Sequence, residues 1–301
     1  MTTFTNRLGV ISLLDNLRAA ELVEFVQGIE ALGYGSYWIP ELFGREPIAT
    51  AAYLLAHTRE ISVATGIANI YVRDPHAMVQ ARHTLSELSG GRFILGLGVS
   101  NVGLNTARGH TWQAPVRKLS KYLDAMEAIT PEGAAHGSVA PLHIAAHGPG
   151  LQAVASARGD GVVTYLMSPE HTRLSRQRIG AEAGLDVVCM MLAETDPARA
   201  RARARTALAY YLGLDYYHRE WLQLGFGKAD FEHGGSDELI DMLVAWGDAE
   251  ALQARIAEHV NAGASRILIM PLDLGAHGVT TSKTLQLLSP AQQSPARGGV
   301  S

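Results

Sequence analysis

Residues 61–75 read ISVATGIANIYVRDP and contain one complete unit of the predicted fold. The run from Ile61 to Gly66 is apolar and rich in β-branched residues, which is typical of a buried strand. The Asp74-Pro75 pair that follows supplies a capping side chain and a proline at the first helical position. The stretch therefore predicts a strand, a loop and a helix start, and it raises the question of what needs room above Gly66.

The same strand-then-helix pattern recurs eight times along the chain. Further helix starts are marked by Ser168-Pro169, Asp196-Pro197 and Asp248, the last with Gly263 as its expected end. The predicted strands are short and mostly apolar on both faces, as expected when helices cover one side of a parallel sheet and the core fills the other. They are Leu8–Leu14, Gly35–Pro40, Ile61–Gly66, Phe93–Gly98, Leu142–Ala146, Gly161–Leu166, Val187–Ala193 and Arg266–Met270.

Eight such units without a linker between halves favour a single α/β domain, a (β/α)8 TIM barrel over residues 1–288, rather than two doubly wound domains. Between the seventh and eighth strands we expect a helical insertion, roughly Asp196 to Leu243, whose aromatic cluster from Tyr210 to Trp221 serves packing or walls a substrate pocket. The polar, Pro/Gly-rich residues 289–301 predict a disordered tail. Function is expected on the loops after the strands.

Composition narrows the classes of protein that fit. The 301-residue chain is 47% hydrophobic and 18% charged with a net charge of −4, which is typical of a globular protein and gives no sign of nucleic-acid binding. The alternating arginines from Arg199 to Arg205 are read as a solvated helix. Cys189 lies alone in an apolar run and predicts a buried, inert thiol. No secretory pattern or membrane-spanning run is present, so we expect a cytoplasmic protein without a membrane partner. The histidines form no tight ligand cluster, so no metal is expected.

Three strand exits carry glycine: TGIAN at 65–69, GLGVSNVGLN at 96–105 and AAHGPGLQA at 145–153. Glycine leaves space for a ligand near the backbone, and a following helix N-terminus attracts an anion. The third exit also fits the dinucleotide fingerprint G-x-G-x-x-A, so a Rossmann enzyme is an alternative. Against it, the next strand ends without the acidic residue that binds ribose. Both readings predict an anion, expected to be a phosphate group, over the helix that begins near Gly148.

The stretch TGIANIYVRDPHAMVQARHTLSELSGGRFILGLGVSN, with SYWIPE before it and AAHGPGLQAVASARGDGVV and HGGSDELIDMLVAWGD after it, resembles the bacterial luciferase-like monooxygenase superfamily. Within that superfamily the chain looks most like actinobacterial oxidoreductases that use the deazaflavin coenzyme F420. The resemblance implies a (β/α)8 barrel that holds a flavin or deazaflavin across its C-terminal mouth. It also implies a non-proline cis peptide at Gly66-Ile67, where a bulge at the end of the third strand would back the cofactor ring.

The resemblance further implies a set of site residues. The backbone from His147 to Gly150 would cradle the cofactor phosphate, Ser100 and Asn101 would lie near the ring, and Glu41 would face the reactive centre. The expected cofactor-binding residues are Gly66, Ile67, Ala68, Asn69, Gly98, Ser100, Asn101, Asn105, His147, Gly148, Pro149 and Gly150.

The chain departs from the related sugar-phosphate dehydrogenases at two positions. Leu42 and Val102 stand where those enzymes have a histidine and a glutamate, so the same mechanism is not expected. Besides Glu41, His110 is the candidate acid or base, because it follows the fourth strand and histidine titrates near neutral pH. Trp112, Tyr71 and Phe43 suggest an aromatic pocket lining.

Three functions stay open. The first is an F420-dependent oxidoreductase that transfers hydride to or from a small organic substrate, and the second is an FMN-dependent monooxygenase on the same fold. The third is a barrel that carries flavin or deazaflavin without turnover. A homodimer is expected by family analogy.

Overall fold

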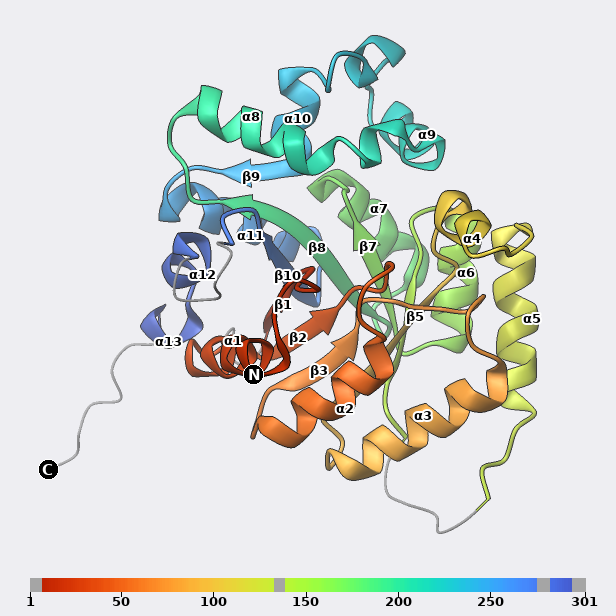
Figure 1. The fold of residues 1–301 in the computed structure, drawn as a ribbon. Helices are drawn as coiled ribbons and strands as arrows, with labels where there is room; N and C mark the ends of the chain where they lie inside the picture. Colours follow the sequence, from red (N-terminus) through yellow and green to blue (C-terminus); the bar gives the residue numbers. More distant parts are fainter. Residues whose placement is uncertain (1–6, 133–138, 275–281, 294–301) are drawn as a thin grey trace, which may run out of the picture.

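The computed structural model describes residues 7–132, 139–274 and 282–293. Eight parallel strands close into a barrel, because β10 pairs with β1 on one side and with β8 on the other (Figure 1). The predicted (β/α)8 barrel is therefore confirmed. The barrel strands are β1 (Leu8–Ile11), β2 (Ser36–Ile39), β3 (Ser62–Thr65), β5 (Phe93–Gly98), β6 (Leu142–Ala145), β7 (Gly161–Tyr165), β8 (Gly184–Leu192) and β10 (Arg266–Pro271).

The strand boundaries agree with the sequence prediction most closely at β5, which spans the predicted Phe93–Gly98. The first strand ends at Ile11 rather than Leu14, and β8 begins at Gly184 rather than Val187. The third strand stops at Thr65, and after a cis Gly66-Ile67 peptide the chain re-forms a two-residue strand, β4 (Ala68–Asn69), on β5. The expected cis peptide is thus confirmed.

Helices follow the strands and cover the outside of the barrel. The predicted caps are confirmed, because Asp74, Ser168, Asp196 and Asp248 each accept a hydrogen bond from a backbone N–H of the first helical turn. The helices are α1 (Ala19–Ala31), α2 (Pro47–His57), α3 (Pro75–Leu88), α4 (Val102–Ala107), α5 (Pro115–Glu127), α6 (Pro149–Arg158), α7 (Pro169–Ile179), α11 (Ala249–Asn261), α12 (Lys283–Leu287) and α13 (Pro290–Gln293).

The predicted insertion lies between β8 and β10 and gathers on one side of the barrel mouth (Figure 1). It ends in a three-residue strand that the sequence analysis did not expect, β9 (Val244–Trp246), which pairs with the far end of β8. A second hydrophobic cluster, centred on Trp221, Leu208 and Leu239, joins the insertion to the barrel residues Leu166 and Met190. Its helices are α8 (Pro197–Leu208), the 3₁₀ turn η2 (Tyr211–Gly213), α9 (Asp215–Gln223), the 3₁₀ turn η3 (Lys228–Phe231) and α10 (Asp237–Leu243).

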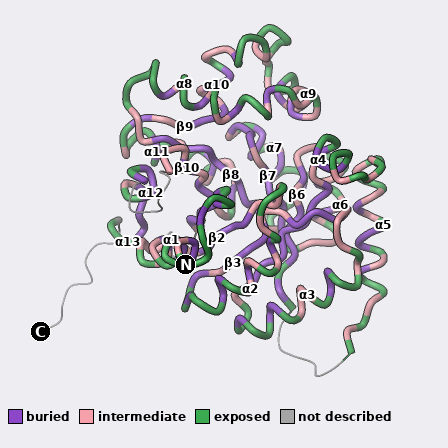
Figure 2. The backbone as a smooth tube through the Cα atoms, in the orientation of Figure 1, coloured by how far each residue is buried: buried purple, intermediate pink, exposed green. Residues whose placement is uncertain are grey.

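The barrel strands are the most completely buried part of the chain, whereas the outer helix faces are exposed (Figure 2). Alternate residues of the strands point inward and outward. The inward set fills the barrel with one residue from each of seven strands: Ile11, Trp38, Ala64, Ile94, Val163, Val188 and Leu268. Nearer the N-terminal ends of the strands, His143 Nδ1 lies 2.5 Å from the buried carboxylate of Asp186. The barrel interior is therefore filled at its middle and at the N-terminal ends of the strands. Space for a ligand is left at the C-terminal ends.

The remaining sequence predictions can be placed on this fold. Cys189 is buried in β8, and burial raises the pKa of its thiol to about 12, as expected of an inert cysteine. Arg201 pairs with Asp237 and Asp241, in keeping with the predicted solvated helix. The tail predicted to begin at residue 289 instead starts with the buried Ser289 and helix α13, while residues 294–301 lie outside the described part of the chain. No helix in the described ranges is long and apolar enough to cross a bilayer.

Candidate active site

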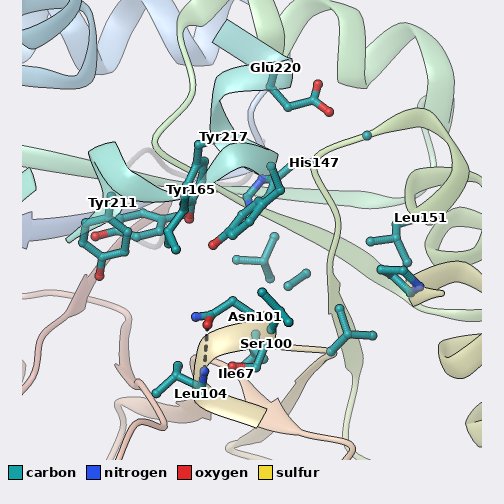
Figure 3. A pocket seen from close by; sticks show the side chains of 18 of the residues that line it. Ile67, Ser100, Asn101, Leu104, His147, Leu151, Tyr165, Tyr211, Tyr217 and Glu220 are labelled. Carbon is teal, nitrogen blue, oxygen red and sulfur yellow. Dashed lines mark hydrogen bonds between the residues drawn. The ribbon is translucent and has the colours of Figure 1, made fainter. Parts of the chain in front are cut away.

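A cavity of about 870 Å³ opens at the C-terminal end of the barrel, between the strand exits and the insertion. Its floor consists of inward-facing strand residues, and its walls come from the loops after β3, β5 and β6 and from α9 (Figure 3). Nine predicted site residues line it: Glu41, Gly66, Ile67, Ser100, Asn101, His147, Gly148, Pro149 and Gly150. The structure therefore brings the three glycine-bearing exits together around one space.

The start of α6 forms one wall of this cavity. Gly148 is the N-cap in an extended conformation, and Pro149 takes the first helical position. The first N–H groups of a helix have no partner within the helix, so those of the Gly150 turn are open to an anion. The start of α6 therefore lies at the cavity, where the sequence analysis expects the phosphate, and its role as a phosphate cradle stays a prediction.

The side chain of His147 adds a feature that the sequence did not indicate. Its Nδ1 is buried and has no hydrogen-bond partner in the described ranges, while its carbonyl oxygen accepts a bond from His171 Nε2 at 3.0 Å. Burial, helped by the nearby His171, lowers the pKa of His147 to about 3. The imidazole is thus neutral at physiological pH, and one nitrogen is left for a ligand to satisfy.

The exits of β3 and β5 form the opposite wall, where Figure 3 shows Ile67, Ser100, Asn101 and Leu104 facing the tyrosines across the pocket. Ser100 has a positive φ of 58°, which turns the chain sharply away from β5. Asn101 caps α4 by accepting from the Leu104 N–H at 3.0 Å. Gly98 lies behind this wall, because a Cβ there would come within 2.6 Å of Ile67 Cδ1. Its role is to let Ile67 pack against the strand.

Asn69 and Asn105 do not reach the cavity. The Asn69 amide donates to Asn105 Oδ1 at 2.8 Å, and its own Oδ1 accepts from the Tyr71 N–H. Asn105 in turn donates to the carbonyls of Val99 and Asn101. Both side chains are buried and engaged within the protein, as is Ala68 next to them, so these three residues tie the two strand exits together and do not line the site.

Glu41 lies at the cavity edge, but both of its carboxylate oxygens are occupied. They accept from Arg73 at 2.8 and 3.1 Å, and one of them also accepts the Asn69 N–H at 2.8 Å. Arg108 lies 3.8 Å from the second oxygen. A carboxylate held by two guanidinium groups is suited to fixing the bulge after β3, which makes Glu41 a positioning residue in this geometry.

His110 is not among the residues that line the cavity. Its ring packs 5.9 Å from that of Tyr71, which itself stacks behind Trp112. Trp112 does line the cavity, as predicted, whereas Phe43 is 63% exposed and lies under Arg108. The structure therefore gives no support to His110 as the proton-transfer group.

Tyrosines make up the wall on the insertion side. Tyr211, Tyr216 and Tyr217 come from the predicted aromatic cluster, and Tyr165 comes from the end of β7. Burial raises the pKa of Tyr165 and Tyr217 well above the ordinary value of a phenol, so both hydroxyls stay protonated. Sequence reasoning missed Tyr165, because GVVTYL reads as an ordinary buried strand. The clue was its position at a strand's C-terminal end.

The polar groups of this cavity are mostly neutral phenols, amides and an imidazole. Among the described residues, no group of three His, Cys, Asp or Glu side chains is arranged to hold a metal ion. A mostly apolar cavity with a few convergent hydrogen-bond donors is typical of a site for an organic ligand or cofactor.

Such a cavity at the mouth of a (β/α)8 barrel, with a helix start on one wall, is typical of barrel proteins that bind an organic ligand at the ends of their strands. The chain belongs to the luciferase-like monooxygenase family, which it matches over residues 2–266.

Two kinds of comparison extend this assignment. The 5,10-methylenetetrahydromethanopterin reductase of Archaeoglobus fulgidus is 26% identical over 86% of this chain and 91% of its own length. An F420-dependent glucose-6-phosphate dehydrogenase of Kineococcus radiotolerans is also 26% identical, over 52% of this chain and 56% of its own. The solved coenzyme F420-dependent tetrahydromethanopterin reductase of Methanopyrus kandleri has a TM-score of 0.69 and 17% identity, covering 94% of this chain and 97% of that one. The last likeness shows the fold.

Proposed function

We propose that this protein is an F420-dependent oxidoreductase that transfers hydride between the deazaflavin and a small organic substrate. The observation that carries the proposal is that the open helix start at Gly148–Gly150 and the wall at Ile67 and Ser100 border the same cavity. A phosphate-bearing, planar cofactor needs both surfaces at once. The name of the Kineococcus radiotolerans relative, which matches about half of this chain, supports F420 as that cofactor.

The residues present fit such a group. A Cβ on Gly66 would come within 3.0 Å of Ile11 Cδ1 and 3.2 Å of Trp38 Cβ, so a larger residue would crowd these barrel side chains beside the cavity. His147 Nδ1 is a buried polar atom without a partner among the described residues, which a bound ligand could satisfy. The backbone of Gly148 to Gly150 would hold the phosphate, and Ile67, Ser100 and Asn101 would border the ring.

When bound, the deazaflavin supplies a ring carbon that donates or accepts hydride. The chain's own residues then have to orient a substrate against that carbon and exclude water. The tyrosine wall and Trp112 enclose the space. The neutral Tyr165 hydroxyl donates to Met270 Sδ at 3.4 Å, and it would have to exchange this weak contact for a substrate carbonyl or imine. Binding and orienting a substrate in this way does not require a charged carboxylate.

The second candidate is an FMN-dependent monooxygenase. The specific observation in its favour is membership of a family named for luciferase-like monooxygenases. A non-catalytic flavin or deazaflavin carrier is the third. Substrate-dependent oxidation of the bound, reduced cofactor would exclude the carrier.

A parallel titration of the purified apoprotein with F420 and with FMN tests the proposal, with cofactor absorbance and fluorescence as readouts. Gly148→Asp is the site variant and Gly148→Asn is its matched control of equal size. Gly148 has φ −84°, so either side chain is compatible with the backbone. We expect micromolar F420 binding that Asp weakens at least about tenfold more than Asn, because a negative charge is placed at the phosphate cradle.

Preference of the wild-type protein for FMN would contradict the proposal and direct the search to oxygen-dependent chemistry. Binding of neither cofactor would contradict both candidates. If F420 binds, reduced F420 mixed with small ketones, imines and enones is the next screen, and reoxidation is read from the deazaflavin absorbance.

A further inference from the structure

We propose that Glu220 makes the cofactor site favour a phosphodiester, with one negative charge, over a phosphomonoester, with two. This inference rests on the proposed function and names the residue that would select F420 over FMN. Both cofactors offer a flat ring and a phosphate, and one difference between them is the charge of that phosphate.

The position of Glu220 is the first step. Its Oε1 lies 3.1 Å from the place where a Cβ on Gly148 would stand, directly at the N-cap of α6. Glu220 belongs to α9 of the insertion, and Figure 3 shows its side chain on the same side of the pocket as His147. A carboxylate therefore lies against the helix start that is otherwise suited to an anion.

The helix that carries Glu220 is firmly held. The neighbouring Trp221 is fully buried, donates from its indole N–H to the Leu166 carbonyl at 3.0 Å, and stacks on Tyr217 at 5.5 Å. Glu220 itself is only partly buried and lines the cavity. The charge is thus fixed near the phosphate cradle by its neighbours, and its own carboxylate is left facing the ligand space.

Electrostatics gives the second step. Burial raises the pKa of Glu220, while Arg178 and Arg219 act on it in the opposite direction. No hydrogen bond contributes to this balance, so the carboxylate is not neutralised by a direct partner within the described ranges. The α6 N-terminus and the cationic Arg219, which also lines the cavity, attract a phosphate in proportion to its charge, and Glu220 opposes them in the same proportion.

The two cofactors differ in that charge. The phosphate of F420 is a diester with one negative charge, whereas the phosphomonoester of FMN carries close to two above its second pKa of about 6. The electrostatic energy by which Glu220 repels FMN is therefore about twice that for a diester, and so is its effect on the logarithm of the dissociation constant. Specificity then arises from a repulsive element aimed at the wrong ligand.

The test uses three ligands with one ring and increasing phosphate charge: riboflavin, the monomethyl ester of FMN, and FMN. F420 is titrated in parallel. Dissociation constants are measured for the wild-type protein, Glu220→Gln and Asp215→Asn, at about pH 8, where the monoester is doubly charged. Asp215 is the matched control, because it is a carboxylate on the same helix that also borders the cavity but is solvent-exposed.

We expect Glu220→Gln to tighten FMN binding at least about tenfold, the methyl ester by about the square root of that factor, and riboflavin by less than about twofold. Asp215→Asn should change each constant by less than about twofold. An equal change for all three ligands, or none, overturns the inference regardless of how F420 behaves. A wild-type protein that binds F420 no more tightly than FMN contradicts the proposed function, whatever the charge series shows.

Discussion

Acidification should destabilise this protein through two buried histidines, His171 and His259. Both side chains are almost fully buried, at 3% and 1% exposure. His259 Nδ1 lies 2.9 Å from the Thr172 hydroxyl, and His171 Nε2 donates to the His147 carbonyl. Burial lowers the pKa of His171 to about 4 and that of His259 to about 3.

The sign follows from these pKa values. Unfolded histidine has a pKa of about 6.5, so the unfolded chain takes up protons first as the pH falls, and the free energy of unfolding decreases below that pH until the folded pKa values are reached. A pH of about 5 lies about 1.5 units below the unfolded pKa of each histidine. This difference lowers the free energy of unfolding by about 2 kcal/mol for each histidine. The two together remove about 4 kcal/mol, and His147, whose pKa burial also lowers to about 3, adds to the loss. This is a large share of the roughly 5–15 kcal/mol of a typical domain.

Urea denaturation at about pH 7 and about pH 5 measures this loss. His259→Gln keeps a polar partner for Thr172 but no longer titrates, so the difference in unfolding free energy between the two pH values should shrink by about 2 kcal/mol. The control is Leu252→Ala, a fully buried position on the same helix α11, which should lower stability equally at both pH values. A His259→Gln protein with the same pH dependence as wild type would refute the reasoning.

Three further predictions concern the barrel floor, the cavity edge and assembly. Asp186→Ala should destabilise the protein by about 3–5 kcal/mol, because it leaves His143 without its buried partner; chemical denaturation measures it, and a loss below about 1 kcal/mol would contradict the pairing. Glu41→Gln should weaken cofactor binding about tenfold through the lost Arg73 pair while turnover at saturating cofactor stays within about threefold; a hundredfold loss of turnover would instead make Glu41 an acid or base. The protein is expected to be a homodimer, which sedimentation equilibrium tests; a monomer at micromolar concentration would count against the family analogy.

The fold was predictable because each βα unit carries local signals. Asp74-Pro75 and Ser168-Pro169 state where helices begin, and those caps depend only on residues within one turn. Strand β9 was missed for a related reason: Val244–Trp246 follows α10 without a break, so its apolar residues read as a continuation of the helix. Only the pairing with β8 makes it a strand, and that contact is not local.

The site was predictable where the backbone decides it and not where side chains do. Gly66 and Gly148 border the cavity as expected, since a glycine at a strand exit leaves room for a ligand near the backbone. Asn69, by contrast, is occupied by Asn105, a partner 36 residues away, and the sequence holds no sign of that pair. A polar side chain near a strand end can bind either the ligand or another side chain. Only the three-dimensional contacts show which of these two partners it has.

The second hydrophobic cluster has a consequence for how this enzyme can diversify. The side chains that pack around Trp221 and Leu239 stabilise the tyrosine wall largely apart from the residues that fill the barrel. Substitutions at Tyr211 or Tyr216 can therefore alter which molecules fit the pocket while the eight strands keep their packing. Laboratory evolution aimed at new substrates should accordingly tolerate substitutions at these two tyrosines better than in the strands, whereas the fully buried Trp221 and Leu239 should have to be kept.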